Sequence, residues 1–169
     1  KPLCLVIIVL IQLVIAFFGY NLVHAFERYA FPILVIIFVI AVGWIFAKSS
    51  PGAPSHGGGI GGFLITLGAA FGYAVGWNPY AADYTRYFAP DTSKRAVALW
   101  SGLGVFVSCV LLEAAGAASA TVTGIGAINA NPTGAFTGHL PTFLADLTLL
   151  AITLGAIAAN VLNIYSGAL

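Results

Sequence analysis

The stretch GYAVGWNPYAADYTRY, from Gly72 to Tyr87, lies in a long apolar run and decides how the chain is interpreted. Its centre, GWNP at residues 76–79, predicts a break in a helix, because proline lacks an amide donor and crowds the carbonyl four residues before it. Inside hydrocarbon, such a break is tolerated only where the backbone is buried in protein or lines a cavity. The break is therefore a candidate binding site, with a plain proline kink around a packed tryptophan as the competing interpretation.

Three residues at the break suit a planar ligand that carries polar groups. Trp77 offers a flat apolar face for stacking. Asn78 offers a hydrogen-bond donor and an acceptor beside it. Gly76 permits a close approach that a side chain would forbid. We therefore expect these three residues to belong to a substrate-binding site.

The composition assigns the chain to the integral membrane proteins. Of its 169 residues 60% are hydrophobic and 7% are charged, whereas charged residues make up about a quarter of a soluble domain. The net charge of +1 gives no reason to expect a nucleic acid partner. Cys4 and Cys109 imply neither a disulfide framework nor a metal site, and we expect no cofactor. The chain begins at Lys1 and ends at Leu169 in an apolar run, so we expect an internal fragment of a longer protein.

Apolar runs separated by polar segments predict a single membrane-embedded, all-α segment with one broken helix. A span needs about 20 residues to cross the hydrocarbon core. The five expected spans are residues 3–26, 29–47, 60–88, 96–120 and 142–169. Two longer loops are expected at residues 48–59, which are rich in glycine, proline and serine, and at residues 121–141, which are uncharged and rich in turn residues.

The distribution of lysine and arginine predicts the orientation of these spans. The turns on one side carry more positive charge, from Arg28, Arg86, Lys94 and Arg95, than the other side, where Lys48 and Lys1 fall. Because cytoplasmic loops carry an excess of lysine and arginine, the first side is expected to be cytoplasmic. The loops at 48–59 and 121–141 then face outward.

Two carboxylates inside the expected spans are candidates for coupling or gating, because a charge at mid-bilayer is costly and therefore usually functional. Asp83 precedes Arg86 by three residues on one helical face, so a local ion pair is the simpler interpretation. Glu113 lies deeper, and the sequence offers it no obvious cationic partner. It is either a site that takes up a proton or a protonated packing residue near the outer end.

Asn160 and Asn163 stand three residues apart on one face of the last expected span. Their amide side chains suit the donor and acceptor edges of a neutral polar solute. Hydrogen bonding between helices is the alternative use of the same groups. Both asparagines are therefore candidate substrate contacts, with a structural role left open.

Three stretches together resemble the nucleobase:cation symporters of the purine-cytosine permease type. They are GWNPYAADYTRY at residues 76–87, GYNLVHAFERY at 19–29 and NVLNIYSG at 160–167, in matching order and spacing. The resemblance covers essentially the whole chain. It implies helices four to eight of a twelve-helix transporter whose first ten helices form two inverted repeats in the LeuT-like arrangement. The partners that it implies are a small nucleobase substrate, the lipid bilayer and the remaining helices.

The resemblance also implies a function and assigns roles to residues. It implies a secondary transporter that imports a nucleobase such as cytosine across the plasma membrane, by alternating access and together with a cation. In the family, aromatic and polar groups of the broken sixth helix and an asparagine of the eighth contact the base. Trp77 and Asn160 match these positions, with Gly76 and Asn78 as neighbours.

Departures from the family pattern limit what can be carried over. One branch reads Asn-Asn-x-Pro-Asn in the eighth helix, but residues 159–163 read Ala-Asn-Val-Leu-Asn, so the base preference is left open. Sodium-coupled members carry hydroxyl residues where this chain has Leu154 and Gly155. Because hard cations need oxygen ligands, we expect proton rather than sodium coupling.

Three alternatives remain beside nucleobase transport. The same fold is compatible with allantoin, hydantoin or a vitamin-like heterocycle as cargo. An intramembrane enzyme that uses Asp83 and Glu113 is disfavoured, because the two carboxylates lie in different spans and toward opposite sides. A structural membrane subunit that does not transport explains the small residues of the spans but not the Trp-Asn-Pro centre.

Overall fold

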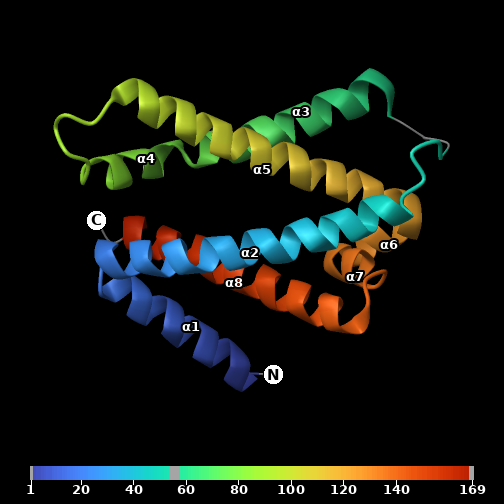
Figure 1. Ribbon diagram of the computed structural model, residues 1–169, viewed down its shortest axis with the longest axis horizontal. Coiled ribbons are helices and arrows are strands. Elements are labelled where there is room, and N and C mark those ends of the chain that lie inside the picture. Colours follow the sequence, from blue (N-terminus) through green and yellow to red (C-terminus); the bar gives the residue numbers. More distant parts are fainter. Residues whose placement is uncertain (1, 54–57, 168–169) are drawn as a thin grey trace. The chain divides into compact units, whose positions relative to one another are not determined.

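The computed structural model describes residues 2–53 and 58–167, and all the regular structure in this part of the chain is helical (Figure 1). The helices are α1 (Pro2–Phe17), α2 (Tyr20–Lys48), α3 (Gly59–Gly76), α4 (Asn78–Thr85), α5 (Lys94–Thr123), α6 (Ile125–Ala130), α7 (Pro132–Thr137) and α8 (Thr142–Gly167). The all-α prediction is therefore confirmed for the described residues. Residues 54–57 of the expected loop at 48–59, and the last two residues of the expected final span, lie outside them.

The chain divides into two compact units. The first contains the residues up to Ser49 and those from Ala118 onward, and the second is Ser50–Ala117. The first unit therefore holds α1, α2, α6, α7, α8 and the end of α5, and the second holds α3, α4 and most of α5. Each unit is described by itself below.

The first unit has a packed apolar core in which α8 contacts both α1 and α2. Its centre consists of Ala16, Val23, Ile157, Val161 and Tyr165. Ile157, Val161 and Tyr165 recur at intervals of four residues along α8, so they fall on one helical face. The small and branched side chains let the helices approach closely, which is how membrane helices associate.

A second cluster joins the far end of α2 to the region around α7. It contains Ala41 and Ile45 of α2, Ala118 of α5 and Leu140 before α8. Beside it, the indole Nε1 of Trp44 and the Nζ of Lys48 both donate to the backbone carbonyl of His139, at 3.2 and 3.3 Å. The Lys48 ammonium also lies 5.4 Å from the centre of the Trp44 ring. Two hydrogen bonds thus hold the segment just before α8 against the end of α2.

The second unit lacks a comparable core around its broken helix. Neither α3 nor α4 contains a buried residue among those described. Side chains such as Ile65 and Phe71 are 75% and 69% exposed. The helix α5 begins where the side-chain oxygen of Ser93 accepts from the amide of Ala96 at 3.3 Å, which is the usual form of a helix N-cap.

The boundary between the first two expected spans is wrong. The structure ends α1 at Phe17 and begins α2 at Tyr20, rather than breaking between residues 26 and 29. The physical reason is Gly19, whose φ of 78° lies in the left-handed region that favours glycine. Pro32 therefore falls inside α2 and not in its first turn. With 29 residues, α2 is about 43 Å long, longer than the ~30 Å hydrocarbon core, so its first turns can carry charge beyond the membrane edge.

The expected loop at residues 121–141 is wrong in its conformation, because much of it is helical. The helix α5 continues to Thr123, Gly124 turns the chain with a φ of 83°, and α6 and α7 follow. The side chain of Asn131 caps α7 by accepting from the amide of Gly134 at 3.0 Å, and Pro132 occupies the first turn. Turn residues here begin and end short helices, as capping chemistry allows.

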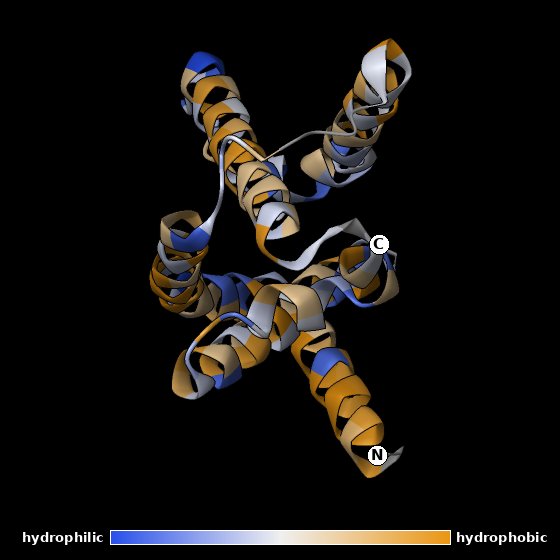
Figure 2. Cartoon of the chain, turned by 90° about the vertical axis from the view of Figure 1, so that its right-hand side faces the viewer, coloured by the Kyte–Doolittle hydropathy of each residue, from blue (hydrophilic) through white to orange (hydrophobic). Residues whose placement is uncertain are grey.

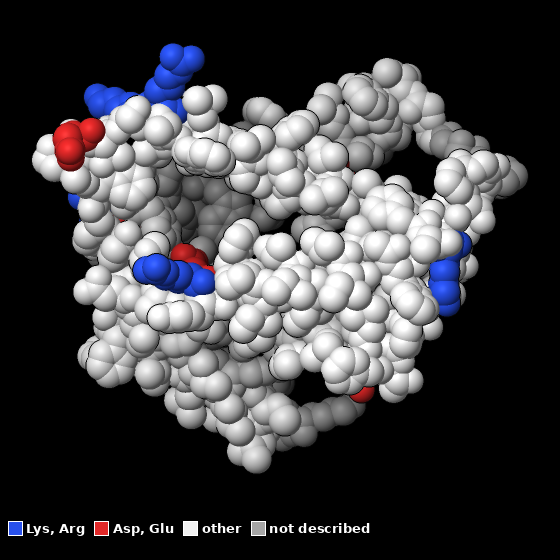
Figure 3. All heavy atoms as spheres, viewed as in Figure 1, with Lys and Arg blue, Asp and Glu red and all other residues white. Residues whose placement is uncertain are grey.

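Four helices in the described part of the chain are long and apolar enough to cross a membrane. They are Tyr20–Lys48, Gly59–Thr85, Lys94–Thr123 and Thr142–Gly167. The shorter α1 is also apolar, and apolar colouring extends along the helices in Figure 2. On the face seen in Figure 3, charged side chains are few, and most of the visible surface is uncharged. The chain is thus an integral membrane protein, whereas the count of five full spans stays a prediction.

Candidate functional site

The predicted helix break is confirmed and is confined to one residue. The helix α3 ends at Gly76 and α4 begins at Asn78, with Trp77 between them. The backbone of Trp77 stays in the right-handed helical region, with φ −83° and ψ −10°. Its carbonyl accepts from the amide of Tyr80 at 3.1 Å, three residues ahead, which is a tighter turn than the α-helix makes. The break is therefore a kink between a long and a short half-helix, not an extended unwound segment.

Aromatic rings gather around the break. The ring of Trp77 meets the edge of Tyr73, with centroids 6.5 Å apart, and tilts against Tyr80 at 5.5 Å. Both separations lie in the range in which aromatic pairs attract each other. Trp77 is half-buried and Tyr73 is 58% exposed, so part of this aromatic surface is open to a ligand. The two tyrosines were missed from the sequence, although they stand four residues before and three after Trp77, where helical neighbours meet.

The neighbours of Trp77 are open positions among the described residues. A Cβ added at Gly76 would meet no atom within 4 Å, and the φ of Gly76 is not positive. The backbone therefore does not need glycine here. Asn78 is exposed in the first turn of α4 beside Pro79. A substrate role for Gly76 and Asn78 stays a prediction.

Of the two candidate carboxylates, Asp83 has a partner. Its Oδ1 lies 2.8 Å from an Nη of Arg86, and the two side chains are 16% and 48% exposed. The expected local ion pair is thus present on α4. The coupling or gating role of Asp83 stays a prediction.

Glu113 is exposed on α5, nineteen residues after the first residue of that helix. At 1.5 Å per residue it lies about 28 Å along the axis, close to the full ~30 Å thickness of the hydrocarbon core. If α5 enters the membrane at Lys94, Glu113 lies near the opposite boundary. This placement leaves both earlier interpretations, proton uptake and packing near the outer end, in place.

Asn160 makes a hydrogen bond between helices. Its Nδ2 donates to the Oε1 of Gln12 on α1 at 2.8 Å. Gln12 is only 7% exposed, while Asn160 and Asn163 are exposed on α8. The interhelical use of Asn160 is therefore observed. It does not exclude a ligand, because the Oδ1 of the same amide accepts no hydrogen bond from the described residues. Gln12 interrupted the first apolar run, but its partner lay too far along the chain to be found.

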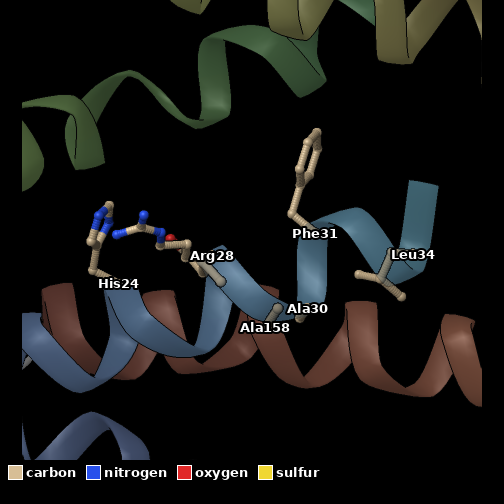
Figure 4. A pocket seen from close by; sticks show the side chains of 7 residues that line it. His24, Arg28, Ala30, Phe31, Leu34 and Ala158 are labelled. Carbon is tan, nitrogen blue, oxygen red and sulfur yellow. The ribbon is translucent and has the colours of Figure 1, made fainter. Parts of the chain in front are cut away.

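An open groove of about 550 Å³ lies along α2 and α8 in the first unit (Figure 4). It is mostly apolar, with charged groups toward one end, and its lining residues are His24, Glu27, Arg28, Ala30, Phe31, Leu34 and Ala158. The stretch GYNLVHAFERY thus supplies one helical face of a groove at the start of α2. Since Pro32 has no amide hydrogen, the carbonyl of Arg28 also lacks its usual helical donor there. In the sequence, the helical spacing of residues 24, 28, 31 and 34 was the signal that could have predicted this shared face.

The expected site residues fall in different units. Trp77, Gly76, Asn78 and Asp83 belong to the second unit, and Asn160 and Asn163 belong to the first. The structure thus brings Trp77 together with two tyrosines, and Asn160 together with Gln12. No three of the histidine, cysteine, aspartate and glutamate side chains in the described ranges gather into a metal-binding group.

Long apolar helices, a helix kinked at an aromatic cluster and sparse charge define a helical membrane protein. The chain belongs to the family described as permeases for cytosine/purines, uracil, thiamine and allantoin, since a sequence model of that family matches residues 1–168. Because this is a family of permeases, the interpretation as an intramembrane enzyme is set aside.

Several curated relatives carry the name purine-cytosine permease. The fcyB protein of Emericella nidulans is 33% identical over 98% of this chain and 35% of its own length. The FCY2 protein of Saccharomyces cerevisiae is 31% identical over 98% of this chain and 33% of its own. The putative purine-cytosine permease YxlA of Bacillus subtilis is 27% identical over 88% of this chain and 32% of its own. The chain thus spans about a third of the length of these relatives. No solved structure matches it.

Proposed function

We propose that the transporter containing this segment imports a purine or pyrimidine nucleobase, such as cytosine, across the plasma membrane. The observation that carries the proposal is the similarity, over 98% of the chain, to two proteins named purine-cytosine permease. The kinked helix with its aromatic cluster supports it, because broken helices of secondary transporters form substrate sites near the bilayer midplane.

In this proposal the base stacks on Trp77, and Tyr73 and Tyr80 hold the indole ring in place. Stacking of a base on an aromatic side chain contributes about 1–3 kcal/mol and suits every base, because each has a π-face. Recognition of a particular base then depends on hydrogen bonds to its edge. We assign this role to Asn160, with Asn78, Gly76 and Asn163 as neighbouring contacts.

The transport mechanism that we propose is alternating access in the LeuT-like arrangement, driven by a cation gradient. We favour the proton over sodium as the coupling ion. Leu154 and Gly155 offer no side-chain oxygen where sodium-coupled members carry hydroxyls, and the nearby hydroxyl of Thr153 donates to the carbonyl of Leu149 at 2.9 Å. Hard cations require several oxygen ligands, and this part of α8 supplies few.

Uptake of radiolabelled cytosine by cells that express the full-length transporter tests the proposal. Adenine, hypoxanthine, uracil, allantoin and hydantoin serve as unlabelled competitors, and each measurement is repeated without sodium and with the proton gradient collapsed. We expect saturable uptake that a nucleobase competes away, that survives removal of sodium and that is lost with the proton gradient. Absence of saturable uptake of any of these compounds would overturn the proposed cargo.

A different heterocycle is the second candidate cargo, because the family description includes thiamine and allantoin. Such a ligand stacks on Trp77 equally well and differs in its edge contacts. Strong competition by allantoin, hydantoin or added thiamine, together with weak competition by every base, would favour it.

A further inference from the structure

The contact between Gln12 and Asn160 determines which half of the Asn160 amide is available to a ligand. The two residues are 148 positions apart in sequence, and the Nδ2 of Asn160 donates to the Oε1 of Gln12 at 2.8 Å. Gln12 is 7% exposed on α1, and Ala16, one turn further along that helix, belongs to the core that joins α1 to α8. The Gln12 carbonyl is therefore held within the protein, while Asn160 reaches the surface of α8.

We propose that Gln12 is a positioning residue that orients the Asn160 amide so that its Oδ1 faces the substrate. An asparagine amide has a donor side and an acceptor side. The Nδ2 donates to Gln12, and the Oδ1 accepts no hydrogen bond from the described residues. This oxygen is complementary to an N–H group, and we assign that group to an exocyclic amino group of the bound heterocycle. The inference rests on the proposed function, in which Asn160 contacts the base.

Rotation of the Asn160 amide alone is unfavourable. It would place its Oδ1 against the Oε1 of Gln12, leaving two acceptors face to face and a buried carbonyl without a donor. A buried polar group without a partner costs about 1–3 kcal/mol. Rotation of both amides together would reverse the hydrogen bond, and Asn160 would then present its N–H groups and prefer a carbonyl edge. Cytosine and uracil distinguish these arrangements, because an amino group in cytosine is replaced by a carbonyl in uracil.

The test is competition of cytosine and uracil for uptake by the full-length transporter, with Gln12→Met as the principal variant. Methionine keeps the length of the glutamine side chain but lacks the accepting carbonyl. We expect the unmodified transporter to prefer cytosine by about tenfold or more, since a site built to bond an N–H rejects an analogue that lacks it. Gln12→Met should reduce this preference by about tenfold, with membrane levels unchanged.

Two further variants keep the test decisive. Ile15→Ala is the matched packing control, because Ile15 lies on α1 against the same core but not in the hydrogen bond. It should keep the cytosine preference even if it lowers the amount of transporter. Gln12→Asn is used if Gln12→Met does not reach the membrane. It keeps an amide but withdraws it by one methylene, which stretches the 2.8 Å contact beyond hydrogen-bonding distance, so it should also lose the preference.

The outcomes separate this inference from the proposed function. Cytosine uptake with an unchanged preference in Gln12→Met, or in Gln12→Asn where that variant is used, would overturn the positioning role and leave the function intact. The positioning role is also overturned if the unmodified transporter prefers uracil, or if Ile15→Ala loses the cytosine preference as fully as Gln12→Met. Absence of any nucleobase uptake by the unmodified transporter would overturn both.

Discussion

The helices around α8 and the broken helix α3–α4 both include segments apolar enough to cross a membrane, but they differ in what their side chains contact. In the first, Val161 and Ala151 of α8 are fully buried, and α1 and α2 complete the core. In the second, no residue of α3 or α4 is buried, and Phe71 is 69% exposed. Apolar exposure of this kind is unfavourable in water and marks an interface or membrane-facing surface.

The difference separates two roles for apolar residues in a membrane protein. Lipid tails are as apolar as leucine, so helices gain little by hiding apolar surface from lipid, and packing and hydrogen bonds hold them together. The first unit shows both kinds of contact, in its cores and in the Gln12–Asn160 bond. The second unit instead carries an exposed aromatic cluster at a kink. Stability is thus expected to respond most to mutations in the first unit, and stacking of the ligand to mutations in the second.

The largest expected effect is on stability, from Ile45→Ala in the first unit. Ile45 is fully buried among Ala41, Ala118 and Leu140. Truncating a buried isoleucine removes apolar contacts and leaves a cavity, which costs about 2–5 kcal/mol of unfolding free energy. Unfolding of the purified full-length protein in detergent, followed by tryptophan fluorescence, measures the loss.

The matched control for that prediction is Phe71→Ala in α3. Because Phe71 is 69% exposed, its truncation should change stability by less than about 0.5 kcal/mol. A loss as large as that of Ile45→Ala would contradict the contrast between the units. It would show that a helix outside this chain covers α3 in the complete protein.

The next effect is on transport, from Trp77→Ala in the second unit. Removing the indole ring eliminates the stacking surface, and a loss of about 1–3 kcal/mol corresponds to roughly 5- to 150-fold weaker binding of the base. Uptake should fall to near background at low substrate concentration, with membrane levels unchanged. The control is Trp100→Ala, since Trp100 is also a tryptophan, is 73% exposed on α5 and lies outside the aromatic cluster. Equal uptake by the two variants would contradict the stacking role.

Local chemistry explains why the kink was predictable and the boundary at Gly19 was not. Proline and glycine within residues 76–79 mark a break wherever they occur in an apolar run. Gly19 ends α1 without a proline, in a run that stays apolar, while the later charged pair Glu27 and Arg28 looked like the exit to water. A helix that is longer than the membrane is thick carries charge without ending, so hydropathy alone misplaced the boundary.

The contacts of the candidate site also divide into those that a local sequence pattern predicts and those that it does not. Tyr73 and Tyr80 lie within one turn of Trp77, so helical spacing was sufficient to find them. The partner of Asn160 is 148 residues away, and no local pattern specifies which of many apolar helix faces packs against which. A single glutamine in an apolar run does indicate that a partner exists, because an unpaired amide in hydrocarbon is costly. It does not say where the partner lies.

The smallest expected effect comes from Asp83→Asn, and it sharpens the account of coupling. The pair with Arg86 is three residues apart on α4, with Arg86 48% exposed. Such a pair contributes about 0.2–0.5 kcal/mol, so Asp83→Asn should hardly change stability. If the pair is only local, uptake by Asp83→Asn keeps its dependence on the proton gradient, and Arg86→Gln, which breaks the same pair from the other side, behaves alike.

Glu113→Gln is the companion to that measurement, because Glu113 has no ion-pair partner among the described residues. If Glu113 carries the coupled proton, its amide variant loses gradient-driven uptake but still binds cytosine, since neutral glutamine mimics the protonated acid. Loss of proton dependence in Asp83→Asn but not in Glu113→Gln would reverse the assignment. The ion pair on α4 would then have to open during transport, and the exposed face of the second unit would hold both the ring-stacking and the proton-carrying groups.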